Sequence, residues 1–268
     1  MTLELITGKD YLSFSAVRNY ANCSEQFRLE RVVGIRTHGS WAMVAGNVFH
    51  TASEKLDKEE ILTTQAALEF AWAHELRDRE PDRIREGKRE NRAWWEEKLL
   101  GFLQEYVRWR DDRFSQGWSW LELNGKPAVE FPVRGELGGV PALGYVDRAM
   151  VNPQGQVFVV DIKTGRWPAP REQLDAYAYL MQQTYDLMPD FGQMYGARKA
   201  EITDTYAFDR SREHLDSWFR AAVLGITNEI YLPNPNQLCG SCEVQPFCSL
   251  KGDPNSIAEI SKPKKKGK

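Results

Sequence analysis

The sequence is first informative through what it lacks. No segment approaches the roughly 18 consecutive apolar residues that a membrane-spanning helix requires. The opening residues, MTLELITGKDYLSFS, have no apolar core of the signal-peptide type, and the chain contains no internal repeat. These absences argue against membrane-spanning and repeat architectures, and they predict a soluble, cytoplasmic protein.

An excess of positive charge is also missing. The formal net charge is −3, whereas domains that bind nucleic acid are usually basic. The average is weak evidence, because an acidic mean can hide a basic groove and because carboxylates that bind a metal ion lower the sum themselves. The charge therefore leaves a nucleic-acid partner open.

Cysteine is scarce and unevenly placed. Cys23 stands alone, whereas Cys239, Cys242 and Cys248 lie together in LCGSCEVQPFC. Disulfides are not expected in a cytosolic protein, where a cysteine cluster more often binds metal. Four cysteines can hold either zinc or an iron–sulfur cluster, and the residues alone leave both open.

The remaining composition is sufficient for a hydrophobic core. Of the 268 residues, 42% are hydrophobic and 12% aromatic, which fits one large domain over residues 1–250. Within it we expect a helical part of about residues 1–125, an α/β core of about 126–232, and a cysteine segment at 239–248 that acts with Cys23. The basic tail, 251–268, is expected to lack fixed structure.

Hydrophobic periodicity predicts the elements of these parts. Helices are expected from Ser13 or Ser15 to about residue 22, and at 41–58, 63–78, 93–113, 170–188 and 210–230. Strands are expected at 127–134, 143–151, 156–163, 192–198 and 203–208. The turn sequence NPQG at 152–155 predicts that the second and third strands form a hairpin. The order of elements indicates a mixed sheet with helices around it.

The stretch VDIKTG, at 160–165, ends one of these strands with a carboxylate and an amine. Because side chains two apart on a strand share a face, Asp161 and Lys163 point one way and Ile162 the other. Alone, this pattern favours an ordinary ion pair at a strand end. The predicted hairpin, however, can place Asp147 opposite Asp161.

Two close carboxylates repel each other unless a cation lies between them. Oxygen ligands of this kind suit Mg²⁺ or Mn²⁺, which polarises a phosphate oxygen and lowers the pKa of a bound water. Lys163 could then stabilise the charge that develops on a phosphate, or orient the attacking water.

Three further features lie around this pair of strands. His50 is on a predicted helix, where a neutral imidazole could complete a site held by two aspartates, although a lone histidine on a helix is more often a structural hydrogen-bond partner. Gln173 and Tyr177 share a face of the following helix and could reach phosphates or sugars, or simply pack. Glu130 could be another acid near the site or the anchor of a buried arginine.

Taken in order along the chain, the motifs resemble the PD-(D/E)XK nuclease superfamily, and within it the RecB-like nucleases. These include the nuclease domains of the RecB and AddB recombination proteins and the CRISPR-associated exonucleases. The resemblance covers nearly the whole chain, and Val146 stands where the name-giving proline would be. It is carried by FSAVRNYANCSEQFRLERVVGI, GNVFH, GYVDRAMVNPQGQVFVVDIKTG, QLDAY and CGSCEVQPFC.

The resemblance implies a restriction-endonuclease-like fold: a mixed central sheet flanked by helices, with a helical N-terminal part and a four-cysteine cluster that joins both ends of the chain. The implied metal ligands are His50, Asp147, Asp161 and the carbonyl of Ile162, and Lys163 is the implied catalytic lysine. Gln173 and Tyr177 would be accessory site residues, and Glu130 stands at a commonly acidic position.

The resemblance also implies a [4Fe–4S] cluster on Cys23, Cys239, Cys242 and Cys248. We interpret this cluster as a staple, because closing so long a loop removes much entropy from the unfolded chain.

The expected function is an Mg²⁺- or Mn²⁺-dependent DNA nuclease, an exonuclease on single strands or duplex ends that acts in recombination, repair or phage DNA metabolism. It would act in the bacterial cytoplasm, or in that of the host if a phage encodes it. The tail KPKKK could add affinity through counterion release. Basic residues near the site are expected to line the path of DNA: Arg166, Arg171, Arg198 and Lys199.

Two other functions remain open at this stage. One is a CRISPR adaptation nuclease that trims spacer precursors, and the other is an inactive iron–sulfur module that binds DNA ends. The chain has no G-x-x-x-x-G-K-[ST] motif, which favours a stand-alone nuclease or a small subunit. A homo-oligomer, or a recombination or CRISPR partner protein, is compatible with the resemblance.

Overall fold

The computed structural model describes residues 2–165, 170–208 and 212–252. The chain forms two compact units. Unit 1 is made of residues up to 37, 135–143 and those from 213 onward, and unit 2 of residues 38–134 and 144–212. Arg166 lies outside the described residues, and so does the expected tail apart from residues 251 and 252. In the described part of the chain, no helix is long and apolar enough to cross a membrane.

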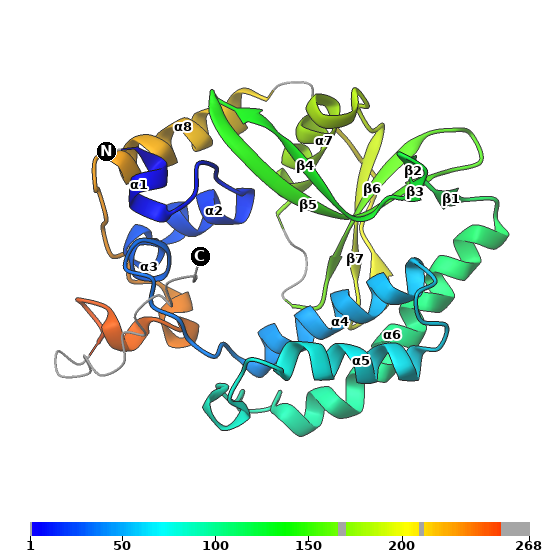
Figure 1. Ribbon diagram of the computed structural model, residues 1–268, viewed down its shortest axis with the longest axis horizontal. Helices are drawn as coiled ribbons and strands as arrows, with labels where there is room; N and C mark the ends of the chain where they lie inside the picture. Colours follow the sequence, from blue (N-terminus) through cyan, green and yellow to red (C-terminus); the bar gives the residue numbers. More distant parts are fainter. Residues whose placement is uncertain (1, 166–169, 209–211, 253–268) are drawn as a thin grey trace, which may run out of the picture. The chain divides into compact units, whose positions relative to one another are not determined.

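Unit 1 is built mainly from short helices (Figure 1). In chain order they are α1 (Leu3–Thr7), α2 (Phe14–Asn22), α3 (Ser24–Phe27), the π-helix η1 (Arg28–Val32), α8 (Glu213–Thr227) and the 3-10 turns η3 (Gln237–Ser241) and η4 (Gln245–Phe247). Ser13 begins α2, as expected, since its hydroxyl accepts a hydrogen bond from the backbone N–H of Ala16 at 3.2 Å. Helix α2 packs on α8, and the Tyr20 hydroxyl donates to the Ile230 carbonyl at 2.6 Å.

The helices of unit 2 are α4 (Trp41–Asp57), α5 (Thr64–Leu76), the 3-10 turn η2 (Pro81–Arg83), α6 (Arg92–Ser115) and α7 (Glu172–Tyr185). Helices α4, α5 and α6 pack together with the sheet around one apolar core, and Figure 1 shows these three helices side by side. Trp41, Trp95 and Tyr106 are its largest fully buried aromatic side chains. Helix α7 packs on β6 and β7.

The sheet is mixed, as predicted. Its strands are β1 (Ser119–Trp120), β4 (Val129–Leu137), β5 (Val140–Val151), β6 (Val157–Lys163), β7 (Phe191–Gly196), β8 (Glu201–Ile202) and β9 (Tyr206–Ala207). The path runs β1-β5-β6-β7-β8, with β4 also paired to β5 and β9 to β7. Strands β2 (Glu122–Leu123) and β3 (Lys126–Pro127) form a separate antiparallel pair. Hairpin β4–β5 contributes residues to both units.

The register of β5 and β6 confirms the expected hairpin. The strands are antiparallel and Arg148 pairs with Val160, so one residue further along Asp147 faces Asp161. Strand β6 is parallel to β7. Val160 and Ile162 enter the core beneath α4 and α6, which leaves Asp161 and Lys163 to the opposite face. The alternation inferred from VDIKTG is therefore correct.

Three expectations about elements need correction. Helix α7 begins at Glu172, two residues after Pro170, and ends at Tyr185 rather than near 188. It ends there because Asp186 is left-handed, with φ of 52°, and because the residue before Pro189 disfavours the helical region. Of the strand expected at 203–208, only Tyr206–Ala207 is a strand, β9, and β8 lies just before the expected range at Glu201–Ile202. The two-residue strands β1–β3 were not expected, because they are too short to show a period.

Two glycines of unit 2 give a matched test of packing. A Cβ on Gly144 would lie 3.0 Å from Cε1 of Tyr177 and 3.3 Å from Cγ2 of Val133, so Gly144→Ala should destabilise the protein by about 1–3 kcal/mol. A Cβ on Gly101, inside α6, would meet nothing within 4 Å, so Gly101→Ala should stabilise it by about 0.5–1 kcal/mol. Urea unfolding measures both, and equal stability of the two variants would contradict the described packing.

Candidate metal and catalytic centre

His50 reaches the end of the sheet because α4 passes close to it. Ser40 caps the helix by accepting from the backbone N–H of Met43 at 3.3 Å. A Cβ on Gly46 would lie only 2.9 Å from Oγ1 of Thr164, the residue that follows β6. The small residue one turn before His50 thus permits the close approach that places its imidazole beside the strand ends.

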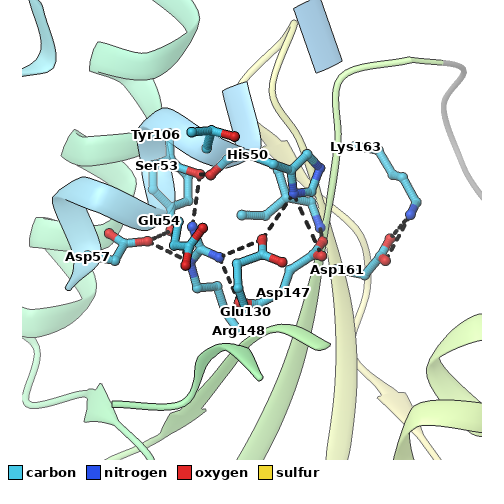
Figure 2. A network of polar contacts seen from close by, with 12 residues as sticks. His50, Ser53, Glu54, Asp57, Tyr106, Glu130, Asp147, Arg148, Asp161 and Lys163 are labelled. Atoms are coloured by element: carbon cyan, nitrogen blue, oxygen red, sulfur yellow. Dashed lines mark hydrogen bonds and ion pairs between the residues drawn. The ribbon is translucent and has the colours of Figure 1, made fainter. Parts of the chain in front are cut away.

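His50, Glu130 and Asp147 form a compact group of ligand atoms, all within 4.8 Å of one another. Nδ1 of His50 lies 3.2 Å from Oε1 of Glu130 and 3.7 Å from Oδ1 of Asp147. Figure 2 shows the contacts that run from the imidazole to both carboxylates. Glu130 reaches this position from a strand residue with φ of 47°, a backbone conformation that is unfavourable for a non-glycine residue and concentrates at functional sites.

Asp161 belongs to a second, adjoining chain of contacts. Nζ of Lys163 donates to Oδ1 of Asp161 at 2.8 Å and to Oε1 of Gln173 at 3.2 Å. Nε2 of Gln173 in turn donates to the Tyr177 hydroxyl at 2.7 Å. The other Asp161 oxygen, Oδ2, is 2.7 Å from the ammonium but not in hydrogen-bond geometry. The fully buried Asp161 thus meets Lys163 on the face that the sequence predicted.

The two chains of contacts meet at Asp147. Its Oδ1 faces His50 and its Oδ2 accepts a hydrogen bond from the backbone N–H of Ile162 at 2.6 Å. The structure therefore brings all of the residues expected at the site and named in this set to one place: His50, Glu130, Asp147, Asp161, Lys163, Gln173 and Tyr177. Ile162 itself is buried in the core, and its carbonyl as a metal ligand stays a prediction.

Burial sets the charge balance of the two aspartates. It raises the pKa of Asp161 to about 6, with the Asp147 charge adding to the effect and the Lys163 charge opposing it. Burial also raises the pKa of Asp147, against the charges of His50 and Lys163. For Tyr177, burial and the two aspartate charges raise the pKa well above its usual value. The carboxylates are thus held where an added cation would be strongly favoured.

The histidine and glutamate respond in the complementary way. Burial lowers the pKa of His50, but the charges of Asp147 and Glu130 and a hydrogen bond to Glu130 outweigh it, so that pKa is raised. Burial raises the pKa of Glu130, but its hydrogen bond to His50 and the charge of Arg148 bring that pKa below its ordinary value. Glu130 therefore stays ionised beside the imidazole.

Arg148 is the residue that sequence reasoning missed. Its side chain is fully buried, and Nη1 donates to Oε1 of Glu130 at 3.2 Å and to the Asp147 carbonyl at 2.6 Å. Its Nη2 donates to Oγ of Ser53 at 2.8 Å, and its Nε donates to Asp57 (Figure 2). An arginine next to Asp147 in an otherwise apolar strand was the available signal. Glu130 accordingly acts both as an acid of the site and as an anchor for a buried arginine.

The four cysteines line one cavity of unit 1, together with Leu29 and Val244. Two sulfurs accept backbone N–H hydrogen bonds at 3.4 Å, Cys23 from Asn234 and Cys239 from Asn236. Burial raises the pKa of Cys242, which the charges of Glu30, Cys23 and Cys239 raise further and a backbone hydrogen bond from Val244 lowers. The remote Cys23 thus meets the C-terminal trio.

The basic residues proposed for DNA are placed differently from one another. Arg198 is held by Glu90, at 2.6 and 2.9 Å, and donates to the Thr164 carbonyl at 2.6 Å, so it fixes the backbone just after Lys163. Arg171 donates to the Ala207 carbonyl at 2.8 Å. Lys199 is exposed, and Arg166 lies outside the described residues.

Comparison with known proteins identifies the family of the chain. The profile of the PD-(D/E)XK nuclease superfamily matches residues 11–249. The chain therefore belongs to the PD-(D/E)XK nuclease superfamily and is a nuclease. Nucleases of this superfamily use divalent metal ions, and the group formed by His50, Glu130 and Asp147 offers acidic and imidazole ligands for one.

Individual relatives come from bacteriophages. The Gene 69 protein of Mycobacterium phage L5 is 27% identical over 288 residues, which cover 89% of this chain and 96% of that protein. The Gene 69 protein of Mycobacterium phage D29 is 26% identical over 266 residues, with the same two shares. A solved structure, that of a proposed exonuclease from Eubacterium rectale, is 15% identical over 88% of each chain, with a TM-score of 0.49.

The raised pKa of Asp161 predicts a gain in stability when its charge is removed. A folded-state pKa of about 6 lies above the unfolded value of about 3.9, so this group contributes stability below about pH 4 and loses it as the pH rises through 6. Without metal at pH 8, Asp161→Asn should therefore raise the free energy of unfolding by about 2–3 kcal/mol.

Urea unfolding in a chelator at pH 8 and at pH 4 measures this difference, which should shrink at the lower pH. Asp204→Asn, at an exposed carboxyl of the same unit, is the control and should change little. A less stable Asp161→Asn protein at pH 8 would show that the Lys163 ion pair outweighs the burial of the charge.

Proposed function

We propose that the protein is a divalent-metal-dependent deoxyribonuclease that acts as an exonuclease on single-stranded DNA or duplex ends. The observation that carries the proposal is the position of Asp147 opposite Asp161, with Lys163 on the same face and His50 beside them. Three acids, an imidazole and an ammonium around one point suit the hydrolysis of a phosphodiester better than the binding of a neutral ligand.

The donor set fits Mg²⁺ or Mn²⁺. Oxygen ligands with one imidazole match these ions, and the buried Asp161 keeps one oxygen without a hydrogen bond. His50, Asp147 and Asp161, with the Ile162 carbonyl, would hold the ion, and Glu130 is placed to join them or to accept from His50. When bound, the ion supplies an activated water and polarises a phosphate oxygen.

The remaining work falls to residues of the chain. Lys163 would turn from Asp161 toward the phosphate, where its ammonium stabilises the charge that develops as water attacks. Gln173 would orient this ammonium by accepting a hydrogen bond from it through the side-chain oxygen, and the hydroxyl of Tyr177 fixes Gln173 in turn. Burial raises the pKa of Tyr177 so far that its hydroxyl stays protonated and works as a hydrogen-bonding group.

We further propose that the cysteine cavity holds a [4Fe–4S] cluster on Cys23, Cys239, Cys242 and Cys248. All four cysteines line this cavity, and sets of four cysteine thiolates hold [4Fe–4S] clusters. The backbone N–H groups of Asn234 and Asn236, which donate to the sulfurs of Cys23 and Cys239, would stabilise the thiolates of such a cluster. All four cysteines belong to unit 1, so the cluster would tie α2 and α3 to the C-terminal segment.

A cleavage assay tests the active site. Lys163→Met and Asp161→Ala should each lower kcat by at least about 10²–10³, because each removes a group that stabilises the transition state or holds the ion. Lys98→Ala, at a lysine exposed on α6 and paired with its neighbour Glu97, is the matched control and should keep full activity. The substrates are end-labelled linear and circular single-stranded DNA with Mg²⁺ or Mn²⁺.

Loss of linear but not circular DNA is the result expected of an exonuclease. Wild-type rates in Lys163→Met would refute the assigned site. Absence of cleavage by the wild-type protein, with DNA binding intact, would favour an inactive module that binds DNA ends.

Replacing one cysteine tests the cluster. Cys239→Ala should lose the brown colour, its iron and much of its solubility, because the link between the two ends of unit 1 is broken. Ser249→Ala, beside Cys248, is the control. Metal analysis of the wild-type protein separates iron from zinc, and a stable, colourless and fully active Cys239→Ala protein would rule out the structural role.

A further inference from the structure

Unit 1 contains a second cavity, which shares no lining residue with the cysteine cavity. Its volume is about 120 Å³, and its lining includes Lys9, Tyr11, Ser13, Arg31 and Arg36. Cavities of about 150 Å³ take up a benzene molecule, so there is room here for a smaller group such as phosphate. None of these residues belongs to the candidate catalytic centre.

The cations of this cavity are exposed. These are Lys9, Arg31 and Arg36, and within the described residues none of them forms an ion pair with a carboxylate. Lys9 lies over the ring of Tyr11, 5.2 Å from its centroid. Three positive charges around one hollow repel each other, and an anion would relieve that repulsion.

One acid, Glu30, is also part of the lining. Both of its oxygens accept hydrogen bonds from amides, one from Asn19 and one from Gln26, each at 2.8 Å. Its charge offsets one of the three cations, so the net charge of the lining remains positive.

A helix terminus adds to the same field. Ser13 and Ala16, at the N-terminus of the nine-residue helix α2, also line the cavity. The Ser13 hydroxyl caps the N–H of Ala16, and the N-terminus of the helix still carries a partial positive charge, which favours an anion. Hydroxyls of Tyr11 and Ser13 supply further hydrogen-bonding groups. Three cations, a helix N-terminus and hydroxyls around one hollow are together suited to a phosphate.

We infer that this cavity binds a phosphate group of the nucleic-acid substrate, outside the catalytic centre. The inference rests on the proposed action on DNA. Two arginines present the planar donor pairs that fit phosphate oxygens, and a contact of this kind adds affinity without reading sequence. The phosphate could belong to the internal diesters of the strand or to a terminal monoester, and oligonucleotides with and without a terminal phosphate distinguish these two sources.

The two cavities of unit 1 share one segment. Leu29 of the π-helix lines the cysteine cavity, whereas Glu30 and Arg31 line the basic one. The cysteine site would hold the π-helix in place through Leu29. Because Arg31 belongs to the same π-helix, an intact cysteine site would keep Arg31 at the basic cavity.

The test compares two double variants with equal loss of charge. Arg31→Gln with Arg36→Gln removes two cations of the cavity, and Arg108→Gln with Lys126→Gln removes two exposed cations of unit 2. Binding of an end-labelled single-stranded oligonucleotide is measured in a chelator, without cleavage, over a range of salt concentrations. The cavity variant should bind about tenfold more weakly, and its slope of log K against log salt should fall by about 0.7 for each phosphate that the variant no longer neutralises.

In the presence of metal, the cavity variant should show a raised KM and an unchanged kcat, since it retains the catalytic residues. Its melting temperature should match the wild type, and Lys9→Gln is a milder variant with the same expected direction. A weakening shared by oligonucleotides with and without a terminal phosphate assigns the cavity to internal diesters. A weakening confined to phosphorylated ends assigns it to the terminal monoester.

Binding by the cavity variant that equals binding by the control double variant would overturn the inference while leaving the nuclease proposal intact. Failure of the wild-type protein to bind any DNA would instead overturn the proposed function. The two failures are thus distinguishable in one set of titrations.

Discussion

The buried guanidinium of Arg148 is the constraint on which the centre of unit 2 depends. A charge with no exposed surface must be matched by carboxylates and hydrogen-bond acceptors, because removing one partner of such a pair costs about 3–5 kcal/mol. Arg148 finds its partners in α4, α6, β4 and its own strand: Asp57, Ser53, Tyr106, Glu130 and the Asp147 carbonyl. The same contacts that satisfy the arginine hold Glu130 against His50 and fix the backbone at Asp147.

The acids beside this network are arranged against stability. Asp147 faces Asp161, both are buried, and both have a raised pKa. A chain selected for stability alone would avoid such a pair, since burying like charges is unfavourable. A bound divalent ion reverses this cost, and Lys163 relieves part of it in its absence. The centre therefore has the electrostatics of a site prepared for a cation and a polyanion.

Unit 1 has a different organisation, in which chain ends that are far apart in sequence line a common cavity. Cys23 and the C-terminal cysteines meet around this cavity, and the helical segment that follows Cys23 lines both it and a basic cavity. A four-thiolate centre would fix this segment in place, because closing the long loop between Cys23 and the C-terminal cysteines removes much entropy from the unfolded chain. Under the two proposals, residues of unit 1 would anchor one phosphate of the substrate, and residues of unit 2 would hydrolyse another.

Some of these features follow from sequence alone and some do not. The two-residue period of a strand is enough to put Asp161 and Lys163 on one face, and the turn NPQG is enough to pair their strand with that of Asp147. Helical spacing likewise predicted the shared face of Gln173 and Tyr177. These rules relate residues that are close in sequence, so a short stretch of sequence is enough to apply them. The partners of Arg148, the double role of Glu130, the division of the helical part between two units and the basic cavity around Arg31 and Arg36 depend on residues tens of positions apart. Only the packing of the folded chain brings those residues together, because burial and charge pairing are set by neighbours in space that no sequence period specifies.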